Sequence, residues 1–249
     1  MFDAALPLML FESQPGIATG LRKEILRRRG AIRHATVRQP APPLDQTTLA
    51  ELDELLNRES CFPVHTLESA PTGAKDGLRN LQESVGFVPN LAAAMAESPE
   101  LLNGFLAVRQ YYEGGTFTPG EIQVLSLTAA FENACAWCMA FHTFMARNHG
   151  ISAESVSALR EGRSPRDPRL RALSDFARSM IRGRGNVGAE ALQQFLDAGY
   201  TRAQALEVVL GMAFSLMANY AGHLVDAPVD PPFQAHAWHG APVGAGVPA

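Results

Sequence analysis

The sequence predicts an all-α protein. Signals for helix starts recur through the middle of the chain, each followed by enough residues for a helix, whereas the polar and apolar alternation of strands is scarce. The chain has 249 residues, of which 47% are hydrophobic, and this is enough to bury one substantial core. We therefore expect one helical domain at residues 46–230, a flexible N-terminal extension at residues 1–45 and a C-terminal tail at residues 231–249.

The two ends differ in composition from the domain between them. Residues 21–38 carry seven Lys or Arg side chains against one Glu, and a proline-rich stretch follows at residues 39–43. This composition is typical of a flexible extension or linker, while a basic docking arm or a targeting peptide remain alternatives. Residues 241–249 contain only Gly, Pro, Ala and Val without periodicity, so we expect them to be loose as well.

The first clear helix start is at Ser98. A capping hydroxyl followed by a proline at the first helical position predicts a helix over residues 99–112, which paired glycines would end. A second start follows at Thr118, again with a proline after it, and Glu121 completes a capping box. The helix that follows over residues 122–131 is nearly all apolar, so it must be buried.

The later helices carry the functional motif and the longest apolar segment. Asn133 is a candidate N-cap for a helix over residues 134–148, which Gly150 would end. Further starts lie at Ser152, Asp167 and Thr201. The last helix, residues 201–225, is long and apolar, but its uncharged stretch at residues 208–222 is short for a bilayer span, so we expect no transmembrane helix.

Charge and cysteine content narrow the class of partner and compartment. There are 21 basic and 25 acidic residues, a net charge of -4, so nothing drives the whole chain toward nucleic acid or an anionic membrane. Small molecules or other proteins are the expected partners. Three cysteines are too few for a secreted disulfide scaffold, and the first ten residues lack a basic region ahead of their apolar run. We therefore expect a cytoplasmic protein.

The functional motif is the pair of thiols at Cys135 and Cys138, with His142 one helical turn further on. Two thiols separated by two residues can close a disulfide within one turn, and the small loop makes that disulfide easy to reduce. If Asn133 is the N-cap, both sulfurs lie near a helix start, where thiol pKa values fall to roughly 3.5 to 7.5. The spacing also predicts that the imidazole of His142 takes the proton of Cys138.

Other interpretations of the motif stay open. Two cysteines on an apolar helix can be small core residues without chemistry. A zinc site would use Cys135, Cys138, His142 and Glu132, although structural zinc usually joins two separate chain segments and no second pair of ligands is evident. His223, on the last helix, is more typical of a hydrogen-bonded core histidine than of a catalyst.

Several segments resemble the carboxymuconolactone decarboxylase superfamily, specifically its alkylhydroperoxidase D-like (AhpD-like), peroxidase-related branch. The similar segments are TPGEIQV at residues 118–124, ENACAWCMAFH at 132–142, GFVPNL at 86–91, ESP at 97–99, Asn219-Tyr220 with His223, and PVD at 228–230. The resemblance covers about residues 62–238. It implies an all-α, AhpD-like helical bundle that forms a homo-oligomer through its apolar helices.

The resemblance also implies roles for the motif residues. Cys138 would be the peroxidatic thiolate, His142 its base within a proton relay, and Cys135 the more exposed resolving thiol that an external dithiol reduces. The chain departs from the best-known hydroperoxidases, because Gln123 and Trp137 stand where those proteins have a glutamate and a histidine. We expect Glu132, or less readily Glu121, to supply the missing carboxylate.

The leading functional hypothesis is a thiol-dependent peroxidase-like oxidoreductase that reduces a small-molecule hydroperoxide substrate, without a bound metal or organic cofactor and with an external dithiol reductant. One alternative is lactone or carboxylate chemistry of the decarboxylase type, which would leave the thiols idle. Another is a redox-sensing oligomeric binding module whose disulfide switches contact with a partner.

Overall fold

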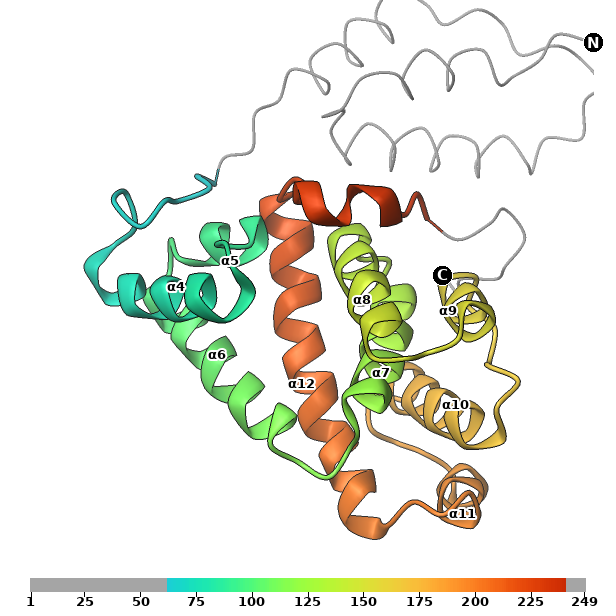
Figure 1. Cartoon of the computed structure of the whole chain (residues 1–249). Coiled ribbons are helices and arrows are strands. Elements are labelled where there is room, and N and C mark those ends of the chain that lie inside the picture. Colours follow the sequence, from blue (N-terminus) through green and yellow to red (C-terminus); the bar gives the residue numbers. More distant parts are fainter. Residues whose placement is uncertain (1–61, 241–249) are drawn as a thin grey trace, which may run out of the picture. The chain divides into compact units, whose positions relative to one another are not determined.

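The longest helix, α12 (Arg202–Val225), runs through the middle of a helical bundle (Figure 1). The computed structural model describes residues 62–240, and in this part of the chain it contains helices and no strand, which confirms the all-α prediction. Helices α6 and α5 pack against α12 on one side, and α7 and α8 on the other (Figure 1). The extension expected at residues 1–45 and the tail at 241–249 lie outside the described residues.

The elements follow one another with short connections. Their bounds are α4 Thr72–Val85, α5 Asn90–Met95, α6 Pro99–Glu113, α7 Pro119–Glu132, α8 Ala136–Asn148, α9 Ala153–Arg160, α10 Pro168–Arg182, α11 Ala189–Asp197, α12 Arg202–Val225 and a 3-10 helix, η1, Pro231–His236.

Local capping starts the helices where the sequence predicts. Thr118 accepts a hydrogen bond from the backbone N–H of Glu121, whose carboxylate accepts one from the backbone N–H of Thr118, so the capping box of α7 is complete. Side-chain caps also begin the helices α6, α9, α10 and α12 at Ser98, Ser152, Asp167 and Thr201. These predicted starts are confirmed.

Helix α7 is the core of the bundle, and α12 is half buried beside it. Every residue of α7 from Gly120 to Phe131 is buried, as its apolar sequence predicts, and α7 packs against α8, α10 and α12. Among the described residues, α12 alone meets the length and composition test for a membrane-crossing helix, which core helices of soluble proteins also meet. The uncharged stretch at residues 208–222 is shorter than a bilayer span, but the helix that contains it extends further at both ends.

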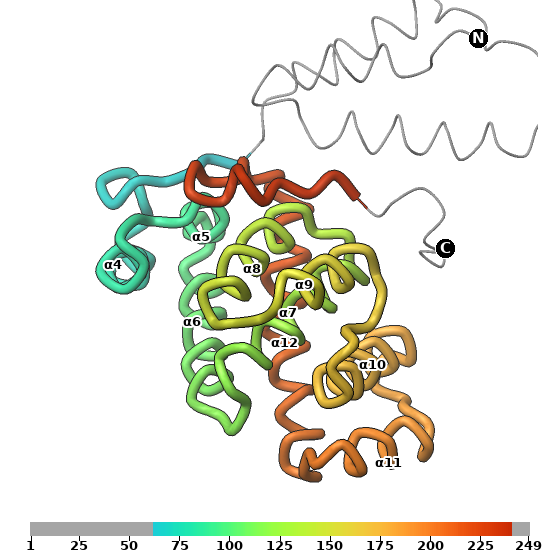
Figure 2. The backbone as a smooth tube through the Cα atoms, turned by 45° about the vertical axis from the view of Figure 1, so that its right-hand side comes forward, coloured from blue at the N-terminus to red at the C-terminus, as the bar shows by residue number. Residues whose placement is uncertain are grey.

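The chain after α12 folds back over the bundle. Residues 226–240, including η1, pack against α8 and lie near α5 (Figures 1 and 2). Phe233 of η1 is 2% exposed and contacts the rings of Trp137 and Phe141. Trp238 is also buried. The packed structure therefore extends about ten residues beyond residue 230, where the sequence placed the start of a tail, because these aromatic side chains complete the core.

Candidate active site

The two cysteines lie at the junction between α7 and α8. Asn133 ends α7, and Ala134 takes a left-handed conformation with φ of 53° that breaks the helical path. Cys135 is the N-cap of α8, and the helix begins at Ala136. The prediction that Asn133 caps this helix is therefore wrong, because the chain turns sharply at Ala134 before the helix can start.

The sulfur atoms of Cys135 and Cys138 are 2.8 Å apart. The Sγ of Cys135 also accepts a hydrogen bond from the backbone N–H of Cys138 at 3.4 Å, which is the capping contact of α8. Both residues are thiols and both are buried, with exposed fractions of 2% for Cys135 and 0% for Cys138. Cys135 is thus only marginally the more exposed of the two.

Burial controls the ionisation of Cys138. Loss of solvent raises the pKa of its thiol well above the usual value, and the neighbouring sulfur of Cys135 raises it further. A hydrogen bond from Asn219 and one from a backbone amide act in the opposite direction. The expected lowering of this pKa by the helix start is therefore wrong, because desolvation of a fully buried sulfur outweighs it. Cys138 is a neutral thiol at pH 7.

The ring of His142 is buried and binds Gln123. Nδ1 of His142 lies 2.8 Å from Oε1 of Gln123. Because that oxygen can only accept, Nδ1 carries the proton and Nε2 keeps its lone pair. Burial, with a contribution from the positive charge of Arg109, lowers the pKa of His142 to about 3, so the imidazole is neutral at pH 7. Within residues 62–240 no hydrogen bond joins this ring to the sulfur of Cys138, so the expected direct contact between them is not made.

The carboxylate of Glu132 does not take part in this arrangement. Its oxygens accept hydrogen bonds from Arg178 and Arg182 of α10, at 2.8 to 3.0 Å. Glu121 is likewise occupied, by the capping box and by Arg169 and Tyr200. The expectation that either glutamate completes the relay to His142 is wrong, since ion pairs with α10 hold both.

No metal site is assembled around the thiols. Among the described residues, no three side chains of the types His, Cys, Asp and Glu are grouped closely enough to hold a metal ion. Glu132, the fourth ligand of the zinc interpretation, instead forms ion pairs with Arg178 and Arg182 of α10.

Trp137 lies between the two cysteines in sequence, and its side chain contacts the C-terminal segment and α8. Its Nε1–H donates to Oδ2 of Asp230 at 2.9 Å, and its ring stacks on Phe141. The other carboxylate oxygen of Asp230 accepts from the backbone N–H of Asn90, at the start of α5. Trp137 therefore anchors the C-terminal segment to α8 and α5.

Sequence reasoning missed the contribution of α12 to the site. Asn219 is 1% exposed and accepts at Oδ1 a hydrogen bond from Nδ2 of Asn133, at 2.9 Å. Nε2 of His223 lies 2.6 Å from the carbonyl oxygen of Asn133. His223 is thus hydrogen-bonded, as predicted. The signal available in the sequence was the four-residue spacing of Asn219 and His223 on an otherwise apolar helix.

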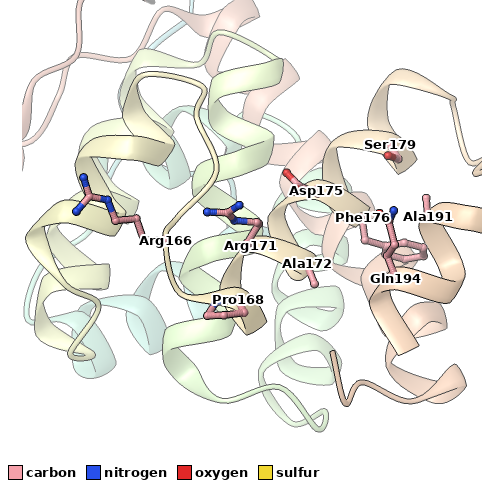
Figure 3. Close-up of a pocket in the computed structure, with 9 residues that line it drawn as sticks. All are labelled: Arg166, Pro168, Arg171, Ala172, Asp175, Phe176, Ser179, Ala191 and Gln194. Atoms are coloured by element: carbon pink, nitrogen blue, oxygen red, sulfur yellow. The ribbon is translucent and has the colours of Figure 1, made fainter. Parts of the chain in front are cut away.

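A surface pocket lies elsewhere, between α10 and α11. Its volume is about 440 Å³, and its lining includes Arg171, Asp175 and Gln194 (Figure 3). None of the residues of the thiol site lines this pocket.

Comparison with known proteins agrees with the fold and the motif. The model of the carboxymuconolactone decarboxylase family matches residues 96–166, which contain both cysteines and His142. A search of curated proteins found no match. Over this segment the chain is similar to the carboxymuconolactone decarboxylase family.

Solved structures share the fold at low sequence identity. A peroxidase-related protein with an AhpD core from Ralstonia eutropha JMP134 has a TM-score of 0.63 and 21% identity, covering 71% of this chain and 95% of its own. A peroxidase-related protein from Silicibacter sp. TM1040 has a TM-score of 0.59 and 19% identity, covering 82% and 100%. A variant of the debrominase Bmp8 in complex with 2,3,4-tribromopyrrole has a TM-score of 0.59 and 16% identity, covering 72% and 97%.

Proposed function

We propose that the protein is a thiol-dependent, peroxidase-like oxidoreductase that reduces hydroperoxides through a dithiol and disulfide cycle of Cys135 and Cys138. The observation that carries the proposal is the separation of 2.8 Å between the two sulfurs at the start of α8. The similarity of residues 96–166 to the carboxymuconolactone decarboxylase family, and of the fold to peroxidase-related proteins, supports an enzymatic function. The geometry favours the peroxidase-like type, because a decarboxylase has no need of adjacent thiols.

The cycle balances in three steps. The sulfur of Cys138 attacks the outer oxygen of ROOH, the O–O bond breaks, and Cys138 becomes a sulfenic acid while ROH is released. The thiol of Cys135 then displaces the hydroxyl of that sulfenic acid, giving the disulfide and water. An external dithiol reduces the disulfide, becomes a disulfide itself and returns both thiols.

The neutral state of the site shapes the first step. Cys138 holds its proton at rest because burial raises its pKa, and His142 is a weak base because burial lowers its pKa to about 3. We therefore propose that the proton leaves the sulfur of Cys138 during the attack and ends on the departing RO⁻. Because the imidazole of His142 makes no hydrogen bond to Cys138 at rest, its Nε2 carries this proton only after the opening that admits the peroxide. Gln123 orients the ring for this role by holding the proton on Nδ1.

Burial of the sulfurs implies that access limits the reaction. Neither thiol is more than 2% exposed, so a hydroperoxide reaches Cys138 only when the surrounding helices open. Small peroxides are therefore the expected substrates. A reductant as large as a protein should reduce the disulfide slowly.

The proposal is tested by counting thiols. A Cys61→Ser variant leaves only the motif cysteines. After treatment with one equivalent of hydroperoxide, a thiol reagent should label neither of them, and the mass of the protein should be lower by two hydrogen atoms. Peptide mapping should join Cys135 to Cys138. Retention of both thiols after peroxide treatment would overturn the proposal.

A Cys138→Ser variant separates the three functional classes. Peroxidase turnover should disappear in this variant, whereas decarboxylase turnover would persist. A redox sensor would lose only the binding of a partner that depends on oxidation. Cys61→Ser is the matched control, because it removes a thiol outside the motif and should retain full turnover.

We also propose that the protein forms a homo-oligomer in the cytoplasm. The outer face of α12 presents large apolar side chains at helical spacing, here called the α12 stripe. Its members are Leu206, Val209, Leu216, Tyr220 and Leu224, each between 43% and 73% exposed. An uncharged apolar stripe is complementary to a second copy of itself, and its burial between subunits would remove it from water. The reducing cytoplasm would supply the dithiol that the cycle requires.

A further inference from the structure

Helix α12 passes directly beside the sulfur of Cys135 at a residue that has no side chain. A side-chain carbon added at Gly222 would lie 3.1 Å from Sγ of Cys135, which is tighter than ordinary van der Waals contact. Apart from the neighbouring residues of α12 itself, the one other described atom within 4 Å of that position is a methyl carbon of Leu91, at 3.9 Å. The space that the missing carbon would fill is here called the Gly222 gap.

The backbone does not require a glycine at this position. Gly222 lies inside α12, near its C-terminal end, and it is not among the described glycines with a positive φ. Glycine in a helix interior is less stable than alanine, because it loses more conformational freedom on folding. The feature that distinguishes Gly222 from an alanine is therefore the room that it leaves beside the sulfur.

Two hydrogen bonds hold this part of α12 against the cysteine motif. Oδ1 of Asn219 accepts from Nδ2 of Asn133 at 2.9 Å, and Nε2 of His223 lies 2.6 Å from the carbonyl oxygen of Asn133. The two contacts come from residues on either side of Gly222, and Asn133 closely precedes Cys135 in the chain. The folded structure therefore keeps the Gly222 gap beside this sulfur.

Cys135 is the sulfur of the pair that has surface residues around it. Cys138 is 0% exposed, whereas Ala134, next to Cys135 in the chain, is exposed and Gly222 is half-buried. The rate of exchange between a thiol and a disulfide depends on which sulfur is attacked and on access to that sulfur. Attack by an external thiol is therefore expected at Cys135.

We propose that Gly222 is a specificity-determining residue for the reductant, because the Gly222 gap is where an external thiol approaches and bonds to Sγ of Cys135. A disulfide bond is about 2.05 Å long, so the incoming sulfur and its first carbon need space close to Sγ that a side chain at residue 222 would occupy. Slender, unbranched dithiols are the class of reductant that fits. The inference rests on the proposed function in taking the disulfide of Cys135 and Cys138 as the intermediate.

The reduction balances in two exchanges. A thiolate of the dithiol forms a bond to Sγ of Cys135, the bond between the two cysteines breaks, and the sulfur of Cys138 leaves with the electron pair and takes a proton. The second thiol of the reductant then attacks the reductant sulfur that is bonded to Cys135. This step closes the disulfide of the reductant and releases Cys135 with its electron pair, to take the second proton.

Reduction of a preformed disulfide tests the inference without any peroxide. The parent is the full chain with Cys61→Ser, in which diamide joins Cys135 to Cys138, and mass spectrometry with thiol labelling follows the reduction by dithiothreitol. Gly222→Ala should slow this reduction about tenfold and Gly222→Val about a hundredfold, because each side chain takes up more of the Gly222 gap. Leu91→Val, which withdraws the methyl carbon at the gap, should speed it about threefold.

Sulfide, a reductant with a single heavy atom, is the control for access. It needs much less room than dithiothreitol, so the Gly222 variants should lose less than about threefold in its reaction with the same disulfide. The matched control variant is Gly104→Ala. Gly104 is also a half-buried glycine within a helix, but a carbon added there meets only a methyl group of Met217, at an ordinary contact distance of 3.8 Å. Gly104→Ala should react with both reductants at the parental rates.

The ratio of the two rates decides the outcome. A lower rate with dithiothreitol and a nearly unchanged rate with sulfide supports the inference. Equal losses with both reductants would mean that the substitution disturbs the disulfide itself, and the inference fails, as it does if the Gly222 variants react like the parent. If Gly222→Ala does not fold, a faster reaction of Leu91→Val with dithiothreitol supports the inference and an unchanged one overturns it. If the selectivity shifts as expected but the wild-type chain reduces no hydroperoxide, the inference stands and the proposed function fails.

Discussion

Nδ1 of His142 lies 2.8 Å from Oε1 of Gln123, so a neutral amide holds the buried imidazole. The amide orients the ring but brings no negative charge. Together with burial, this leaves His142 a neutral and weakly basic imidazole at pH 7.

Replacement of Gln123 by glutamate should therefore activate the site. A carboxylate accepts the same hydrogen bond, and its charge raises the pKa of His142 toward neutrality. We expect kcat/KM for hydroperoxide to rise about tenfold at neutral pH, since each unit of basicity is equivalent to about 1.4 kcal/mol. The pH dependence of kcat/KM and an NMR titration of the imidazole measure the two effects. Gln123→Met, which has similar size and no acceptor, should be slower than wild type. Equal rates for all three proteins would contradict the assigned role of Gln123.

Stability should fall in acid because of His142. Its pKa in the folded protein is about 3, below the ordinary value of 6.5, so between these values the unfolded chain binds the extra proton. The stability that depends on a neutral His142 is fully present above about pH 6.5 and is lost as the pH falls toward 3. Over this whole range the loss in free energy of unfolding is at most about 5 kcal/mol. Urea unfolding at about pH 7 and about pH 4 should show a smaller loss of stability for His142→Phe than for wild type. A loss of the same size in both proteins would assign the acid sensitivity to other groups.

The bond between Trp137 and Asp230 should stabilise the C-terminal segment. Trp137→Phe keeps an aromatic ring but leaves a buried carboxylate oxygen without its donor. We expect a loss of about 1 to 3 kcal/mol in the free energy of unfolding, measured with urea. The matched control is Trp238→Phe, which removes an indole bond to the carbonyl oxygen of Arg160 at the far end of the same segment. Because Asp230 is buried, we expect Trp137→Phe to lower the free energy of unfolding by more than Trp238→Phe does. The reverse order would contradict the role of Asp230 as the main anchor of this segment.

The α12 stripe should determine the oligomeric state. Leu216→Glu places a charge in the middle of the stripe, so an assembly formed through this face should dissociate to monomers. Light scattering coupled to size-exclusion chromatography gives the mass directly. Val64→Glu is the control, because Val64 is also an exposed apolar residue but lies outside α12. A monomeric wild-type protein, or an oligomer that survives Leu216→Glu, would rule out assembly through the stripe.

The features that sequence reasoning predicted correctly depend on neighbours along the chain. The caps at Thr118 and Thr201 are decided within four residues, since each side chain binds a backbone N–H three positions ahead. The proximity of Cys135 and Cys138 is equally local, because their separation by three positions at a helix start brings the sulfurs together.

The features that it missed depend on segments brought together by folding. The pairing of Glu132 with arginines of α10 crosses more than forty positions, and the contact of Asn219 with the thiol site crosses more than eighty. No local pattern contains the partner in either case.

The sequence by itself determined that the chain is helical, where most helices begin, and that two thiols lie within one turn of each other, since short-range hydrogen bonding and helix geometry suffice for these. Only the tertiary structure decided the ionisation of the site. The pKa values of Cys138 and His142 depend on how completely other helices exclude water, and that exclusion exists only once α7, α8 and α12 are packed together.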